Sequence, residues 1–239
     1  MARVITFASS KGGTGKTVLV ANVGVAMAGS GKKVVILDAD IRMANLSLIT
    51  GLQDKKTTLH EVLAGEAPVS SAVYSGPEGL KIMPCGISLN GIRRAKFENL
   101  KKVVRELSGT FEFLLVDSPS GLSSEAVMAL TVAQELVIVV IPEITSLSNA
   151  LKLKVIVSHL GIRPLGVVIN RAAGNGLDIP KDEISSALEL PVLGTIPEDE
   201  TVRRSASFGE SVITQSPRSS SAMEFKKLAS AIVKAHRKI

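Results

Sequence analysis

Short apolar runs alternate along the chain with longer segments in which apolar residues recur every three or four positions. The short runs of Val, Ile and Leu predict buried strands, and the longer spacing predicts helices. Regular alternation of the two is typical of a parallel sheet joined by right-handed helical crossovers. Seven strands are expected, at residues 4–7, 34–37, 80–83, 113–116, 136–141, 166–169 and 192–196. Helices are expected at residues 16–28, 97–107, 123–133, 147–160, 182–188 and 222–235.

The pattern continues through the whole chain without an internal repeat. The Ser-rich residues 216–221 predict a loop before the last helix rather than a linker between domains. A chain of 239 residues is long enough to bury one large core. We therefore expect a single α/β domain over residues 1–239, with a mostly parallel, twisted sheet of seven or eight strands and helices on both faces.

Polar or turn-forming residues stand directly after five of the expected strands. In open parallel sheets, ligands bind beyond the carboxyl ends of the strands, so these residues are expected to meet at one site. They are Asp38 and Asp40, Asp117, Pro142 and Glu143, Asn170, and Pro197, Glu198 and Asp199.

A glycine-rich segment joins the first strand to the first helix. It reads Ser10-Lys11-Gly12-Gly13-Thr14-Gly15-Lys16-Thr17 and continues into Val18. Strand, glycine loop and helix stand in the order of a P-loop. Glycines keep side chains away from the loop N–H groups, which surround a triphosphate together with the positive end of the helix. An ordinary glycine turn is the weaker alternative, so we expect residues 10–18 to bind the phosphates of ATP or ADP.

Two residues of this loop have a specific expected role. Lys16 is expected to neutralise charge between the β- and γ-phosphates and to act in catalysis, and the Thr17 hydroxyl is expected to bind Mg²⁺. The general motif begins with glycine, whereas this chain has Ser10 followed by an additional lysine, Lys11.

The loop KGGTGKT resembles the "deviant" P-loop of the MinD/ParA family, in which the additional lysine is the signature. The run VVILDADIRMANLSLITG is similar to archaeal members. This resemblance covers almost the whole chain. It implies a P-loop NTPase fold, ATP hydrolysis, and a homodimer in the ATP state, in which Lys11 reaches the phosphates of the partner subunit. A solvated Lys11 is the alternative.

The same resemblance assigns the two switch segments. It implies that Asp40 positions the attacking water, that Asp38 lies near the metal, and that Asn45 orders the nucleotide-binding segment. Asp117, at the end of an apolar strand, is placed as a Walker B carboxylate that holds a Mg²⁺-bound water. Turn formation and helix capping are the alternative role of the Asp38–Asp40 pair. Ser120 replaces the alanine that is usual in the family.

Two further segments match the base-contacting positions of the family. The first is Asn170 and Arg171, where an amide both donates to and accepts from a base edge. The second is the loop of Pro197, Glu198 and Asp199. Plain turns at strand ends are the alternative for both segments.

Composition narrows the class of protein. Hydrophobic residues make up 45% of the chain and charged residues 21%, which is typical of a soluble globular protein. With six Phe, one Tyr and no Trp, a binder that stacks nucleobases on aromatic side chains is disfavoured. Cys85 is the single cysteine, so neither an intrachain disulfide nor a C-x-x-C cluster site is expected. We expect a cytoplasmic protein, with peripheral contact at the inner face of the cell membrane as the alternative.

The target of the switch stays open at this stage. The net charge of +6 favours an acidic partner. We favour a MinD-like role in cell division or in placing cellular structures, together with an activator or cargo protein. The alternatives are a ParA-like ATPase that binds nonspecific DNA and a nucleotide-responsive binding module with negligible turnover. A basic last helix could lie on anionic membrane, although we favour a core helix; its cations are Lys226, Lys227, Lys234, Arg237 and Lys238. A DNA-binding patch would comprise Arg93, Arg94, Lys96, Arg203, Arg204 and Arg218, although we favour scattered solvated charges.

Overall fold

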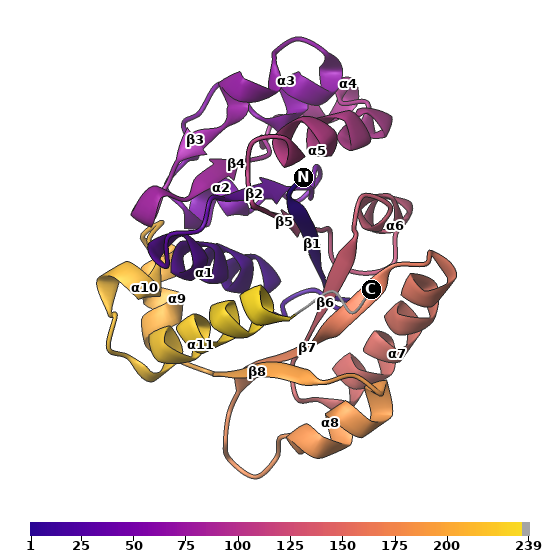
Figure 1. Cartoon of the computed structure of the whole chain (residues 1–239), viewed down its shortest axis with the longest axis vertical. Helices are drawn as coiled ribbons and strands as arrows, with labels where there is room; N and C mark the ends of the chain where they lie inside the picture. Colours follow the sequence, from indigo (N-terminus) through magenta and orange to yellow (C-terminus); the bar gives the residue numbers. More distant parts are fainter. Residues whose placement is uncertain (236–239) are drawn as a thin grey trace.

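A computed structural model describes residues 1–235 of the chain. Its centre is one eight-stranded sheet with the strand order β3-β4-β2-β5-β1-β6-β7-β8 (Figure 1). Neighbouring strands are parallel except for the pair of β3 and β4. The strands are β1 (Arg3–Ala8), β2 (Val34–Asp38), β3 (Tyr74–Ser75), β4 (Lys81–Met83), β5 (Phe113–Asp117), β6 (Glu135–Val140), β7 (Arg163–Ala172) and β8 (Val192–Pro197).

Helices connect the strands and cover both faces of the sheet (Figure 1). The α-helices are α1 (Lys16–Gly29), α2 (Leu46–Ile49), α3 (Leu59–Ala64), α4 (Leu89–Arg94), α5 (Leu100–Ser108), α6 (Ser124–Leu130), α7 (Ile144–His159), α8 (Lys181–Leu188), α9 (Glu200–Ser207), α10 (Val212–Gln215) and α11 (Ser220–Lys234). Short 3-10 turns lie at η1 (Val69–Ala72), η2 (Pro77–Gly79) and η3 (Phe97–Asn99).

The alternation of side chains along each strand separates the core into layers. On β1, Ile5 and Phe7 pack in the cluster that contains α1 and α11, whereas Val4 packs in the cluster that contains α3 and α5. A third cluster joins β6 and β7 to α7 and α8. Because both faces of the strands are covered, their sequences are almost continuously apolar. The predicted α/β fold is confirmed.

The predicted elements differ from the observed ones mainly at their ends. All seven predicted strands are present, and β3 is an additional strand of only two residues. The predicted helix at residues 97–107 is divided into η3 and α5. The helix predicted at 147–160 begins earlier, at Ile144, and the last helix begins inside the predicted Ser-rich loop, at Ser220. The prediction missed α2, α3, α4, α9 and α10.

Helix α11 is a core helix with a basic outer surface, as favoured from the sequence. Phe225, Leu228 and Ile232 are buried against α1 and β8, whereas the basic side chains of residues 226, 227 and 234 are exposed. The predicted surface residues Arg237 and Lys238 lie outside the described residues. None of the helices in the described range 1–235 is both long and apolar enough to cross a membrane.

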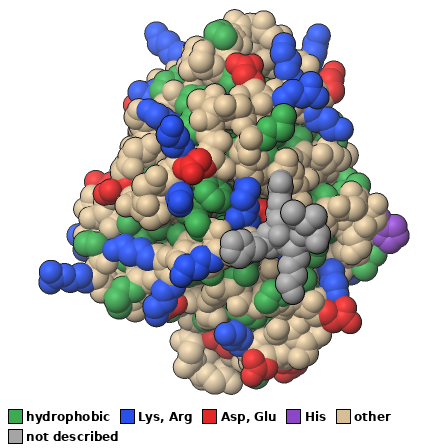
Figure 2. Space-filling model, in the orientation of Figure 1, with side chains coloured by type: hydrophobic (Ala, Val, Ile, Leu, Met, Phe, Trp, Pro, Cys, Tyr) green, Lys and Arg blue, Asp and Glu red, His purple; other side chains and the backbone are tan. Residues whose placement is uncertain are grey.

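The arginines and the lysine considered as a DNA-binding patch do not form one surface. Arg93 and Arg94 lie on α4, whereas Arg203 and Arg204 lie on α9, on a separate part of the molecule (Figure 1). On the face drawn in Figure 2, Lys and Arg side chains are scattered among polar and apolar ones. This arrangement is one of scattered surface charges, as favoured from the sequence.

Candidate nucleotide-binding site

The central strands bring residues from three distant parts of the sequence to one edge of the sheet. Strand β5 lies between β1 and β2, and Asp117 of β5 pairs in register with Phe7 of β1 and with Asp38 of β2. Because these strands are parallel, their carboxyl ends lie together. The glycine loop that follows β1 is therefore next to both carboxylates, as the sequence predicts.

The loop before α1 has the backbone conformation that its glycines allow. Gly13 and Gly15 have φ angles of 79° and 76°, in the left-handed region that favours glycine. A Cβ atom at Gly15 would lie 2.6 Å from Nδ2 of Asn170, so the position is also sterically closed to side chains. Helix α1 begins at Lys16 without a side-chain cap and without an acidic residue in its first turn. Its N-terminus is therefore suited to an anion.

Lys16 is buried together with two carboxylates. Its side chain is 5% exposed, and Nζ contacts Oδ1 of Asp117 at 2.5 Å. Asp38 and Asp117 are each 1% exposed. Burial, followed by the nearby charge of Asp117, raises the pKa of Asp38 well above its ordinary value. A further cation bound beside these two carboxylates would favour the charged form of Asp38.

The donor atoms at this edge fit Mg²⁺ in the presence of a nucleotide. Within residues 1–235, no group of three or more His, Cys, Asp or Glu side chains is placed to hold a metal ion. Magnesium requires fewer protein ligands, because it usually binds one or two carboxylates together with phosphate oxygens and waters. Asp38 and Asp117 supply such carboxylates, and the half-buried Thr17, next to Lys16, supplies a hydroxyl.

The segment after β2 is organised by Asp38. Its Oδ1 accepts a hydrogen bond from the backbone N of Asp40 at 3.1 Å, and its Oδ2 accepts one from the backbone N of Leu46 at 3.3 Å. Asp40 is half-buried, and its Oδ1 accepts from the N of Met43 at 3.0 Å. The exposed Asn45 donates from Nδ2 to the carbonyl of Met43. Asp38 and Asp40 therefore also make the turn contacts of the alternative prediction.

The segment after β5 is attached to the strand and loop of the P-loop. Ser118 donates from Oγ to the carbonyl of Phe7 at 2.9 Å, and the N of Gly121 donates to the carbonyl of Ser9 at 2.9 Å. The Ser120 hydroxyl would lie 3.7 Å from a Cβ atom at Gly12. The serine that departs from the family pattern is thus placed directly beside the glycine loop.

Lys11 lies in an ion pair within its own chain. Its Nζ donates to Oε2 of Glu143 at 2.8 Å and to Oγ1 of Thr145 at 3.3 Å. Glu143 is the residue before α7, and its side chain is 56% exposed. The structure thus places Lys11 at the surface, in an exposed ion pair. The position of Glu143 at a strand end indicated that it belongs to the site, but not that it pairs with Lys11.

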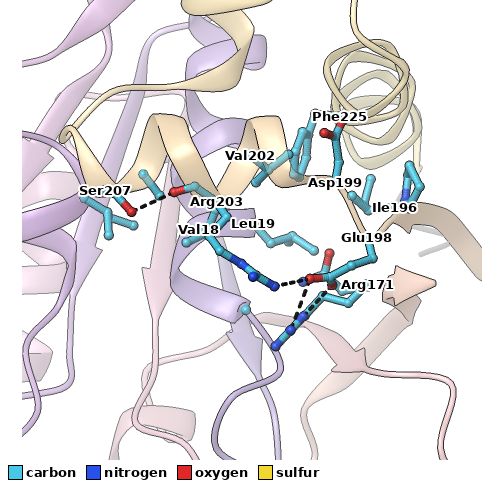
Figure 3. A pocket seen from close by; sticks show the side chains of 15 residues that line it. Val18, Leu19, Arg171, Ile196, Glu198, Asp199, Val202, Arg203, Ser207 and Phe225 are labelled. Atoms are coloured by element: carbon cyan, nitrogen blue, oxygen red, sulfur yellow. Dashed lines mark hydrogen bonds and ion pairs between the residues drawn. The ribbon is translucent and has the colours of Figure 1, made fainter. Parts of the chain in front are cut away.

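A cavity of about 350 Å³ adjoins the glycine loop (Figure 3). Its walls come from α1, the ends of β7 and β8, α9 and α11. The five residues predicted to contact the base line this cavity, although they come from two separate segments of the sequence. They are Asn170, Arg171, Pro197, Glu198 and Asp199. Val18 and Leu19 from α1 contribute apolar surface, as does Phe225 from α11. The size and the apolar walls suit a nucleobase.

Polar contacts fix the rim of this cavity. Asn170 donates from Nδ2 to the carbonyl of Thr14 at 2.7 Å, which ties β7 to the glycine loop. Glu198 accepts from Nε of Arg171 at 2.6 Å and from NH2 of Arg203 at 2.8 Å (Figure 3). The hydrogen bond from Arg171 is the main reason why the pKa of Glu198 is lowered. Arg203, which was considered for a DNA-binding patch from the sequence, lies at this rim with its side chain largely exposed.

The comparison with family models decides the family. The model described as the CobQ/CobB/MinD/ParA nucleotide binding domain matches residues 5–212. The chain belongs to this family. The segment matched by the CobQ/CobB/MinD/ParA model contains the glycine loop, Asp38, Asp117 and the rim of the cavity, whereas Phe225 lies beyond it.

Relatives in the same family have similar sequences and nearly the same fold. An uncharacterized ATP-binding protein of Methanocaldococcus jannaschii is 44% identical over 233 residues, which cover 98% of this chain and 88% of that protein. The cell division ATPase MinD of Pyrococcus furiosus has a TM-score of 0.95 at 37% identity, covering 99% of this chain and 100% of that chain. The septum site-determining protein MinD of Pyrococcus horikoshii OT3, complexed with Mg-ADP, has a TM-score of 0.94 at 36% identity, and the match covers 98% of this chain and 97% of that chain.

Proposed function

We propose that this chain is a Mg²⁺-dependent ATPase that forms a homodimer when ATP is bound and acts as a MinD-like spatial switch in cell division or in placing cellular structures. The observation that carries the proposal is the buried group of Lys16, Asp38 and Asp117 beside an uncapped helix N-terminus. The Pyrococcus horikoshii MinD structure with Mg-ADP supports the same ligands.

The glycine loop binds the phosphates in this proposal. Backbone N–H groups of residues 10–18 and the N-terminus of α1 face the phosphate oxygens. When the nucleotide binds, the Lys16 ammonium group leaves Asp117 and contacts the β- and γ-phosphates. There it stabilises the negative charge that develops as the γ-phosphoryl group is transferred. Thr17, Asp38 and Asp117 would hold Mg²⁺, which supplies charge neutralisation at the phosphates.

Asp40 orients the attacking water. It stands on the loop that Asp38 holds through two backbone N–H groups, so its position is fixed relative to the carboxylates. A half-buried carboxylate at this place accepts a hydrogen bond from water and aligns it with the γ-phosphate. Asn45 closes the same loop through the carbonyl of Met43.

The cavity beside the loop receives the adenine. Asn170 holds the loop through its Nδ2 and presents its oxygen to the base, while the apolar side chains of Val18 and Phe225 cover the ring. The segment of Pro197, Glu198 and Asp199 forms the opposite rim.

Lys11 couples ATP binding to dimerisation. In the single chain it pairs with Glu143 at the surface. We infer that Lys11 leaves this pair to reach the phosphates of a second copy, because a triphosphate offers a lysine more negative charge than one exposed carboxylate.

Three variants test the nucleotide chemistry. We expect Lys16→Ala to abolish Mg-ATP binding in calorimetry, and unchanged affinity would refute the phosphate site. Lys11→Ala should bind ATP but lose the ATP-dependent dimer in light scattering. Asp40→Ala should bind and dimerise but release little phosphate; turnover at the rate of the unmodified chain would remove Asp40 from its role. A chain that binds without releasing phosphate is a nucleotide-responsive binding module.

The surface on which the switch works requires a separate experiment. Liposomes containing anionic lipid and a duplex of random DNA sequence are each incubated with the protein in ATP and in ADP. Cosedimentation with liposomes only in ATP supports the MinD-like proposal, with an activator or cargo protein still to be identified. A gel shift of DNA in ATP would instead favour a ParA-like partitioning ATPase.

A further inference from the structure

A buried histidine holds the loop that carries Asp40. His60 lies on α3 and is 1% exposed, and its Nε2 contacts the backbone carbonyl oxygen of Ile41 at 2.9 Å. A carbonyl oxygen only accepts hydrogen bonds, so Nε2 carries the proton and donates it. Ile41 follows Asp40 directly in the sequence. The contact therefore fixes the peptide next to the carboxylate that orients the water.

The histidine ring is enclosed on its other side. A Cβ atom at Gly91 would lie 2.5 Å from Nδ1, and one at Gly86 would lie 2.9 Å from it. Nδ1 has no hydrogen-bond partner within the described part of the chain. A buried polar atom without a partner costs free energy, so packing alone does not explain a histidine at this position. The ring instead supplies a donor to a specific carbonyl.

The helix that carries His60 is firmly attached to the sheet. Thr58 and Glu61 form a capping box, in which the backbone N of Thr58 donates to Oε2 of Glu61 at 2.8 Å. The N of Leu59 donates to the carbonyl of Pro84, just after β4, at 2.9 Å. His60 therefore extends from a rigid support towards the loop.

The loop is also packed through Ile41 and Ala44, which are buried in the core cluster that contains α3. Arg42 and Met43, which follow Ile41, are exposed, and Arg42 pairs with Glu125 at the surface. Asp38 holds the loop from the nucleotide side, and His60 holds it from the side of α3. A shift of the reacting groups by about 1 Å is enough to reduce a rate by about 100-fold.

We propose that His60 is a positioning residue for ATP hydrolysis: through the carbonyl of Ile41 it keeps Asp40 where the carboxylate aligns the attacking water. The proposal rests on the ATPase function proposed above. His60 touches neither the base cavity nor the glycine loop, so its loss should affect turnover and leave nucleotide binding intact.

The variant His60→Phe keeps an aromatic ring, which is larger than imidazole, and removes the donor. We expect kcat to fall about tenfold or more, as for a lost hydrogen bond combined with misplacement of Asp40. KM for Mg-ATP and the Kd of Mg-ADP should stay within about twofold. His60→Gln retains an N–H donor and should recover part of the rate. His159→Gln is the matched control, because His159 contacts a carbonyl of its own helix α7.

Cys85 gives a second measurement that does not depend on hydrolysis. It is the single cysteine of the chain, is buried, and lines a small cavity together with His60. Release of the loop should expose this thiol, so a disulfide reagent should modify His60→Phe several-fold faster than the unmodified chain or His159→Gln. Thermal unfolding of each variant shows that the measurements are made on folded protein.

The outcomes separate the two proposals. An unmodified chain that binds Mg-ATP but releases no phosphate refutes the ATPase function, and the labelling of Cys85 then decides whether His60 holds the loop. Turnover of His60→Phe at the normal rate overturns the positioning role. A fall in kcat accompanied by an equal loss of nucleotide affinity, or equal labelling rates in His60→Phe and the unmodified chain, also overturns it.

Discussion

The substitution Gly15→Ala tests how the glycine loop and the base cavity depend on each other. Gly15 has a φ of 76°, and a new Cβ atom would lie 2.6 Å from Nδ2 of Asn170. That amide donates to the carbonyl of Thr14 at 2.7 Å. Alanine at this position should therefore strain the backbone and also move Asn170 from its place.

A matched control separates the free energy of backbone strain from that of moving Asn170. Gly31 has a φ of 85°, but a Cβ atom there would meet nothing within 4 Å. Both substitutions cost about 1–2 kcal/mol for a left-handed alanine. Only Gly15→Ala also disturbs a buried hydrogen bond, which adds about 1–3 kcal/mol when an acceptor is left without its donor. We expect Gly15→Ala to be less stable than Gly31→Ala by about that second amount.

Urea unfolding of both variants measures the difference in free energy, and calorimetry with Mg-ADP measures binding. Gly31→Ala should bind the nucleotide as well as the unmodified chain does, whereas Gly15→Ala should bind it more weakly, since it alters the loop and Asn170 together. Equal stability and equal affinity of the two variants would refute the steric reasoning.

Three further predictions concern charged side chains of the site. Asp38→Asn should weaken Mg-ADP binding, and its free energy of unfolding relative to that of the unmodified chain should rise from about pH 4 to neutral pH, because the folded state raises the pKa of Asp38. Glu143→Gln should free Lys11 and strengthen the ATP-dependent dimer by at most about fivefold, as expected for an exposed ion pair, in analytical ultracentrifugation. Glu198→Gln should weaken Mg-ADP binding by about fivefold in calorimetry, because it loosens Arg171 at the rim.

The Asp38 prediction has a defined pH window. A carboxyl group with a raised folded pKa contributes stability that is fully present below its unfolded pKa of about 3.9 and is lost as the pH rises through the folded pKa. The stability of Asp38→Asn relative to the unmodified chain, measured by thermal unfolding, should therefore increase as the pH rises from about 4 to neutral. A stability difference that does not change with pH would contradict the assignment.

For Glu143→Gln, a dimer constant that does not change at low salt would contradict the release of Lys11.

Features encoded in short stretches of sequence were predictable. The glycine loop, Asp38 and Asp117 were found because a strand, its polar end and the following turn are adjacent in the chain. Helix α3 was missed although Thr58 and Glu61 form a capping box, a pattern that can be read from the sequence. Strand β3 was missed because two residues are too few to show a period.

Features that depend on long-range packing were not predictable. Arg171 was predicted to contact the base, but its partner Glu198 is 27 positions away and could not be identified from the sequence. Phe225 was read correctly as a core residue, but its place in the wall of the cavity depends on how α11 packs on α1. Lys11 was recognised from its motif, whereas its partner Glu143 is 132 positions away.

The wall contributed by α11 has a consequence for how the protein matures. During synthesis the glycine loop and both carboxylates leave the ribosome long before Phe225. The hydrogen bonds from Arg3 to the carbonyls of Val233 and Ala235, at the end of the same helix, also form only after these residues are made. The base pocket is therefore complete only when the last helix has packed against α1. Nucleotide bound to the finished chain should in turn hold the last helix in place, since a ligand stabilises the state that binds it.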